Sequence, residues 1–218
     1  MRVARPFALP VLLAVCLAGV AGCNVVAPVY LAVHGPEKAP AVFTLDKERT
    51  GVIFVDDRGN RLPRRALRVQ MAEAGEKVIL KKRLVKDMVS GQSALQASAA
   101  DRGGKLLSIA EIGRAVGAQQ VIYAAVEEYR LSPDGQTFEP SLTLRVKVID
   151  AVNDKRVWPE DRAGHVVVVR LPSQQGSPPT GSAERARVED ALAAAAGAAL
   201  SRLFYKHEVP KGPNAPES

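Results

Sequence analysis

The chain has few of the residues and motifs that most often carry chemistry. Its 218 residues include two cysteines, Cys16 and Cys23, and three histidines, His34, His165 and His207. The histidines are scattered and show no H-x-x-x-H spacing, which argues against a histidine metal site. The nucleophile motifs G-x-S-x-G and S-x-x-K are missing, and so is a Gly-rich phosphate loop. We therefore expect no enzyme activity, no catalytic residues, no metal and no bound cofactor.

The chain also lacks an apolar run long enough for an ordinary membrane-spanning helix. Its first apolar stretch, residues 7–21, follows Arg2 and Arg5 and holds no charge. At about 15 residues it is shorter than the roughly 20 that a helix needs to cross a bilayer. A short positive segment followed by such a run is typical of a cleaved signal peptide. Residues 1–22 are therefore expected to be removed.

The end of this segment is distinctive, because Val20, Ala21 and Gly22 stand directly before Cys23. The pattern resembles the signal of bacterial lipoproteins, in which the cysteine thiol carries a diacylglycerol and the new amino terminus is acylated. The resemblance implies that Cys23 is the lipidation site and that the acyl chains hold the protein on a lipid bilayer. Two alternatives stay open: an ordinary signal peptide with an incidental cysteine, and an uncleaved anchor.

The residue after the cysteine bears on location, since Asn24 stands where an aspartate would resemble a retention signal. By resemblance to sorting in enteric bacteria, this favours the outer membrane, with the protein facing the periplasm. Removal of residues 1–22 also takes Cys16 away. If Cys23 is lipidated, no thiol remains for a disulfide, a metal or a nucleophile, so the core alone must stabilise the fold.

The formal charge is +7, and it falls by two when the two arginines of the signal leave. A basic chain suits an acidic polymer, an anionic membrane or nucleic acid, but secretion argues against nucleic acid and no zinc-finger or aromatic RNA-binding motif is present. Arg61, Arg64, Arg65 and Arg68 gather at the start of an expected helix. Cations there oppose the helix dipole. We take them as a candidate partner-binding face, with a merely solvated surface as the alternative.

One acidic pair also stands out. Asp56 and Asp57 follow the apolar strand predicted over residues 50–56. Carboxylates at a strand end often act as a base or bind a metal. The alternative is an aspartate that caps the following turn beside a solvated neighbour. Because no histidine or third acid lies nearby in sequence, we favour the capping interpretation.

The mature chain is divided by composition. Residues 23–41 hold three prolines and predict a short tether behind the lipidated cysteine. Residues 42–207 have the length and apolar content of a single globular domain, with a flexible Pro/Gly/Ser-rich loop at about 171–182. Residues 208–218 are predicted to be a disordered tail.

Hydrophobic periodicity predicts the elements of this domain. A stripe of Leu67, Met71, Ala74 and Val78 predicts a helix that follows Pro63 and ends near residue 81 or 82. Ser108 and Glu111 form a capping box before a second helix, which Gly117 ends. Strands are expected over residues 50–56, 121–126, 142–148, 156–158 and 165–171, with an edge strand over residues 41–45. Residues 84–89 are favoured as a strand over an extension of the first helix. A further helix is expected over residues 185–207, and a helical turn or two over residues 92–100. The order predicts an α/β (α+β) fold: a small mixed sheet with a C-terminal antiparallel meander, covered by two or three helices.

Two phrases resemble a known group of domains. Residues 112–123 read IGRAVGAQQVIY, and residues 146–150 read VKVID before a short turn and Val157-Trp158. They resemble the domain of the curli-secretion lipoprotein, of the lipoprotein activators of penicillin-binding proteins and of TolB-like N-terminal domains. The chain departs from the pore-forming members, because Arg145 and Lys147 occupy its long hairpin and no membrane-spanning hairpin pair is evident. Its tether is also shorter than that of the activators, so it is identified as an uncharacterised branch.

Three functions are considered, in descending order of expectation. The first is a non-enzymatic adaptor that binds another protein in envelope or cell-wall assembly. The second is an oligomeric subunit of a secretion or export apparatus. The third is a hydrolase that uses Asp56. The sequence names neither the partner nor the oligomeric state.

Overall fold

The computed structural model describes residues 38–100, 106–134, 136–172 and 179–209. The chain divides into two compact units, residues 1–39 and residues 40–218. Of the first unit, only the short strand β1 (Lys38–Ala39) is described. Cys16, Cys23 and most of the predicted tether and tail lie outside the described residues.

The second unit holds the remaining elements. In chain order they are β2 (Thr50–Asp56), α3 (Ala66–Lys81), β3 (Asp87–Val89), α4 (Gly91–Ala99), α5 (Ile109–Ala115), β4 (Gln120–Arg130), β5 (Ser141–Asp150), β6 (Lys155–Trp158), β7 (His165–Arg170), α6 (Ser182–Arg202) and β8 (His207–Glu208).

Six of these strands form one mixed sheet. β2 pairs in parallel with β3 on one side and with β4 on the other. β4, β5 and β6 then run antiparallel to one another, and β7 pairs with the first half of β5. The α+β class and the C-terminal antiparallel meander are thus confirmed. The described residues contain four helices, whereas the sequence led us to expect two or three.

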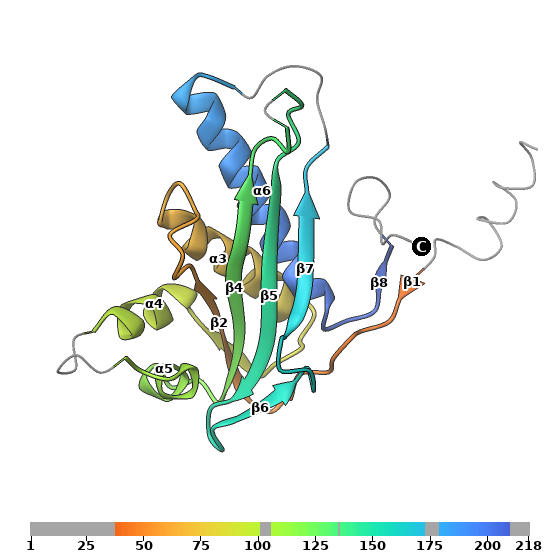
Figure 1. Ribbon diagram of the computed structural model, residues 1–218. Helices are drawn as coiled ribbons and strands as arrows, with labels where there is room; N and C mark the ends of the chain where they lie inside the picture. The colour runs from red at the N-terminus through yellow and green to blue at the C-terminus, as the bar shows by residue number, and fades with distance from the viewer. Residues whose placement is uncertain (1–37, 101–105, 135, 173–178, 210–218) are drawn as a thin grey trace, which may run out of the picture. The chain divides into compact units, whose positions relative to one another are not determined.

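The strand β2 is buried on both faces, which sets the layers of the domain. Ile53 and Val55 join a core with α3 and α6. Val52 and Phe54 join a second core with α4 and α5 on the opposite face. Figure 1 shows α3 and α6 behind the sheet, and α4 and α5 beside β2 and the beginning of β4. A strand without polar side chains on either face needs such cover on both sides.

Several sequence predictions are confirmed. β2 has the predicted bounds of residues 50–56. The capping box is present: Ser108 accepts a hydrogen bond from the backbone N–H of Glu111, whose carboxylate accepts one in return from that of Ser108. Gly117 follows the helix with φ of 78°, a left-handed conformation that glycine adopts without strain. β4 then begins three residues later.

Other predictions were wrong. Residues 41–45 form no strand; instead, the backbone N–H groups of Val42 and Phe43 both donate to the carbonyl of Leu203. The strand expected over residues 84–89 is limited to β3. The last helix ends at Arg202 rather than at residue 207, because Leu203 and Phe204 leave the helix and are buried in the core.

The buried stripe of α3 is also rotated from the one expected. Leu67 and Met71 are buried as predicted, but Gly75 and Ile79 take the places expected for Ala74 and Val78. The cause is the close approach of α6. A Cβ atom on Gly75 would lie 3.2 Å from the carbonyl oxygen of Gly197, and one on Gly197 would lie 2.3 Å from that of Met71. The helices therefore touch through their backbones at two glycines.

This contact predicts the effect of adding one methyl group. Gly197→Ala should lower the free energy of unfolding by about 1–3 kcal/mol, because the Cβ atom would overlap the backbone of α3. At an ordinary helix site the same change would stabilise by about 1 kcal/mol. Denaturant unfolding of the full chain measures the difference. Gly181→Ala, where a Cβ atom would meet nothing within 4 Å, serves as the control and should change stability by less than about 1 kcal/mol. An unchanged or higher stability of the Gly197 variant would contradict the close approach.

Candidate functional site

The four arginines of the predicted basic face do not act as a group. Arg64 donates from Nε to Glu189 at 2.5 Å and from one Nη to Asp190 at 2.6 Å. Glu189 is 4% exposed, so Arg64 neutralises a buried carboxylate and ties the start of α3 to α6. The hydrogen bonds that Arg64 donates to Asp190 and Glu189 raise the pKa of Arg64. This arginine is therefore engaged within the domain.

The other three arginines differ among themselves. Arg61 donates to the carbonyl of Val126 at 3.1 Å. Arg65 is exposed and Arg68 is half-buried. Within the described ranges, the side chains of these last two make no hydrogen bond or ion pair, so a basic partner-binding surface here would rest on Arg65 and Arg68.

The two residues of the acidic pair, Asp56 and Asp57, also have different contacts. Asp57 accepts hydrogen bonds from the backbone N–H groups of Arg61 and Leu62, both at 2.9 Å, and so caps the turn after β2. Asp56 is 8% exposed and accepts from the hydroxyl of Tyr123 and from Nε of Arg58, both at 2.8 Å. Burial and the hydrogen bond to this carboxylate raise the pKa of Tyr123.

A cavity of about 380 Å³ lies beside Asp56, lined also by Arg58, Arg61, Tyr123 and Glu127. Its carboxylates already have donors within the chain. One oxygen of Asp56 receives both of its hydrogen bonds, and Glu127 is bound to Arg145. In the part of the chain that the structure describes, no three acids, histidines or cysteines come together as a metal site would require. Each of these two carboxylates is thus tied to donors of the same chain, whereas the second oxygen of Asp56 receives no bond from the described residues.

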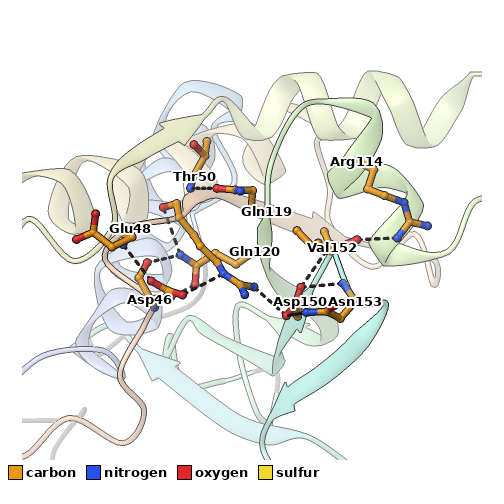
Figure 2. A network of polar contacts seen from close by, with 11 residues as sticks. Asp46, Glu48, Thr50, Arg114, Gln119, Gln120, Asp150, Val152 and Asn153 are labelled. Atoms are coloured by element: carbon orange, nitrogen blue, oxygen red, sulfur yellow. Dashed lines mark hydrogen bonds and ion pairs between the residues drawn. The ribbon is translucent and has the colours of Figure 1, made fainter.

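A second cluster of polar side chains lies at the other end of the sheet, where β4 begins and β5 ends (Figure 2). Asp150, at the end of β5, accepts from Arg49 at 2.8 Å, from the side chain of Asn153 at 2.8 Å, and from the backbone N–H groups of Val152 and Asn153 at 2.9 and 3.0 Å. These bonds fix the β5–β6 turn against the segment before β2. Sequence analysis did not single out Asp150, although an Asp followed three residues later by Asn is a turn signal.

The same cluster includes a buried amide. The side chain of Gln120, 4% exposed, donates to the carbonyl of Asp46 at 2.8 Å and accepts from its N–H at 3.3 Å. Arg114, from α5, donates to the carbonyl of Ala151 at 2.6 Å. The cluster is a structural corner, because each side chain closes a contact between segments of this chain.

The surface that stays available is one face of the sheet, which we call the outer face: Thr143, Arg145 and Lys147 of β5, and Val166 and Val168 of β7. Cross-strand pairing places Thr143 opposite Val168 and Arg145 opposite Val166. The alternate residues of both strands face α6 and are buried. Val166 and Val168 are 44% and 43% exposed. These valines were not evident from the sequence, since a run of four does not show which two face solvent.

A bulge in β4 supplies the outer face with an acid. The pairing of β4 with β5 shifts between Val126 and Glu128, so Glu127 has no partner in the ladder. Its carboxylate accepts two hydrogen bonds from the guanidinium of Arg145, from Nη2 at 2.9 Å and from Nε. Lys147 makes no hydrogen bond or ion pair with the residues that the structure describes.

Comparisons with known proteins add limited information. No protein family and no characterised protein matches the sequence. Among solved structures, the PelC dodecamer from Paraburkholderia phytofirmans has a TM-score of 0.40 and 14% identity, and the match covers 78% of this chain and 97% of that one. Lipoprotein GNA1162 from Neisseria meningitidis has a TM-score of 0.39 and 14% identity, over 66% of this chain and 94% of that one.

The LpoB C-terminal domain from Salmonella enterica has a TM-score of 0.32 and 16% identity, over 56% of this chain and 82% of that one. GNA1162 and a neighbour from Caulobacter crescentus are described as lipoproteins. With TM-scores of 0.40 or less, these likenesses establish neither the function nor the assembly of this chain. Among the described residues, no helix is long and apolar enough to cross a membrane.

The corner at Asp150 predicts a pH dependence. Burial raises the pKa of Asp150, but the hydrogen bonds from Arg49 and Asn153 outweigh it and hold the pKa below its usual range. Because the folded-state pKa is lowered, the stabilisation is complete above the unfolded pKa of about 4 and is lost as the pH falls below it. Asp150→Asn should cost about 1–3 kcal/mol at neutral pH and lose part of the acid sensitivity.

Denaturant unfolding between neutral and acid pH measures both effects. Asp154→Asn, which changes an exposed aspartate in the same turn, is the matched control and should leave the pH profile unchanged. If Asp150→Asn were as stable as the unchanged protein and had the same profile, the corner would not contribute to stability.

Proposed function

We propose that this chain is a lipid-anchored lipoprotein of the bacterial envelope that acts as a non-enzymatic, protein-binding adaptor in envelope or cell-wall assembly. In this proposal residues 1–22 are removed, Cys23 is acylated and residues 24–41 form the tether. The protein then faces the periplasm, from the outer membrane. The observation that carries the proposal is the outer face, where exposed valines adjoin charged side chains on a rigid sheet.

The composition of the outer face supports protein binding. Val166 and Val168 lie side by side with Thr143 and with the ion pair of Arg145. An apolar patch rimmed by polar groups is typical of surfaces that bind other proteins. A sheet also holds its side chains in fixed positions, so binding costs little ordering.

The polar groups favour an adaptor over a hydrolase. Asp56 was the candidate base, yet its carboxylate already accepts from Tyr123 and Arg58. Asp57 is engaged by two backbone N–H groups. Both carboxylates thus have structural roles that account for their positions.

The anchor is tested by removing its attachment point. Cys23→Ala should release the protein from the membrane fraction of its host, because the acyl chains supply the membrane affinity. The unchanged protein should stay with the membranes and show the mass of an acylated chain that begins at Cys23. A Cys23→Ala protein that still fractionates with membranes at full yield would contradict the anchor.

The adaptor role is tested by making the outer face polar. The double change Val166→Ser and Val168→Ser should lower chemical crosslinking of the chain to its envelope partner on the order of tenfold, because central apolar contacts carry most of the binding energy. Quantitative mass spectrometry of crosslinked membranes gives the readout.

Val152→Ser is the matched control, since Val152 is a 56% exposed valine in the β5–β6 turn, away from the outer face. It should leave crosslinking unchanged. Equal partner capture by the outer-face variant would contradict the proposal.

The size of residues 41–218 in solution distinguishes the adaptor from the alternative function, a subunit of an export apparatus. An adaptor should be monomeric or dimeric, whereas a subunit of an export apparatus should form a defined large oligomer.

A further inference from the structure

The sheet has three outer strands whose edges are protected very differently. β3 is only three residues long and begins with Asp87. β6 carries Lys155 and Arg156. Short length and charge are the usual means by which proteins prevent a sheet edge from pairing with another chain. β7 has six residues, and the four between its ends, residues 166–169, are all valine.

The backbone of β7 is open on the side away from β5. Leu171 donates its N–H to the carbonyl of Pro140 at 2.9 Å, so odd-numbered residues of this segment turn their backbone groups toward β5. In an antiparallel ladder the alternate residues point the other way. The N–H and C=O groups of Val166 and Val168 therefore face outward. No described residue offers them a backbone partner.

An apolar cavity lies at the end of this edge. It has a volume of about 250 Å³, and its lining includes Phe138, Leu171, Val188 and Arg187. Leu171 follows β7 directly and packs against the core that β7 shares with α6. The inward-facing side chains of a strand added to β7 would point toward the same layer. The cavity is large enough for one large apolar side chain.

The positive charge of Arg187 at this cavity further restricts which segments can bind. Arg187 is exposed, and its side chain makes no hydrogen bond or ion pair with the described parts of the chain. A second copy of this chain would add further positive charge, because its formal net charge of +7 stays positive after the two arginines of the signal are removed. A segment with a carboxylate would instead complement Arg187.

We propose that β7 binds an extended segment of a partner protein, which adds a strand at the outward edge of Val166 and Val168 and inserts a large apolar side chain beside Leu171. A carboxylate next to that side chain, from an acidic residue or from the end of the partner chain, binds Arg187. Main-chain pairing supplies the affinity, and the cavity and the charge supply the specificity. This inference rests on the proposed adaptor function and names the chemistry of its partner.

The test uses the full chain in detergent and libraries of random peptides of about ten residues, one with free and one with amidated C-termini. Peptides selected from the libraries should be rich in β-branched residues and should place a large apolar residue next to an acid. Enrichment of acids in both libraries identifies a side-chain carboxylate. Enrichment in the free library alone identifies a chain end.

Val168→Pro should weaken binding of the selected peptides on the order of tenfold or more, because proline removes an outward N–H that β7 does not use in its pairing with β5. Val168→Thr keeps that N–H and the β-branched shape, and should bind within about threefold of the unchanged protein. Hydrogen exchange gives a separate readout: bound peptide should protect the amides of Val166 and Val168, whereas those of Val167 and Val169 are protected in every folded variant.

The charge is tested in the same assay. Arg187→Gln should weaken binding of acidic peptides on the order of tenfold. Lys77→Gln, which removes one exposed charge from α3, is the control and should have no effect.

Three outcomes would overturn the inference: no peptide selected, equal binding by Val168→Pro, or a dimer that Val168→Pro separates, which would show a second copy on the edge.

Failure of the adaptor function itself gives a different result. If Val168→Pro captures the envelope partner as well as the unchanged protein does, the adaptor stands and the edge is wrong. If the unchanged protein captures no partner, the adaptor is wrong.

Discussion

The burial of β2 on both faces is the constraint on which the rest of the structure depends. With only apolar side chains between its ends, this strand needs a layer of helices on each side, and the chain places α3 and α6 on one face and α4 and α5 on the other. The second layer covers β2, the start of β4 and the end of β5. The sheet continues into β5 and β7 beyond this cover, so the outer face exists because the antiparallel part of the sheet extends further than one helical layer.

The polar side chains reinforce this division. Charged groups at the ends of the sheet are engaged in closing the fold: Arg64 neutralises a buried glutamate between helices, and Asp150 fixes a turn against the segment before β2. Such contacts stabilise the domain but leave little for a ligand. The groups that remain to bind a partner are backbone N–H and C=O groups and apolar side chains. The proposed mode of binding therefore follows from what the fold leaves unsatisfied rather than from a cluster of reactive groups.

The sequence predicted local structure better than it predicted contacts. β2 and the capping box of α5 were evident because their signals lie within a few consecutive residues. The end of α6 was missed because Leu203 and Phe204 continue an apolar pattern although they leave the helix. Arg64 seemed free because its partner Glu189 lies 125 residues away. Likewise, the exposure of Val166 depends on which strand ends the sheet, which no local pattern records.

The charge of the outer face depends on the one extra residue that the bulge inserts in β4. Glu127 is the one residue of β4 that the ladder with β5 does not need, and it is also the acid that binds Arg145. A chain shorter by this residue would keep Tyr129 opposite Leu142, with the core undisturbed. Arg145 would lose its counterion and become a free cation. Loss of this one residue would thus change the charge of the outer face, and with it the partners that the face attracts, without a substitution in the core.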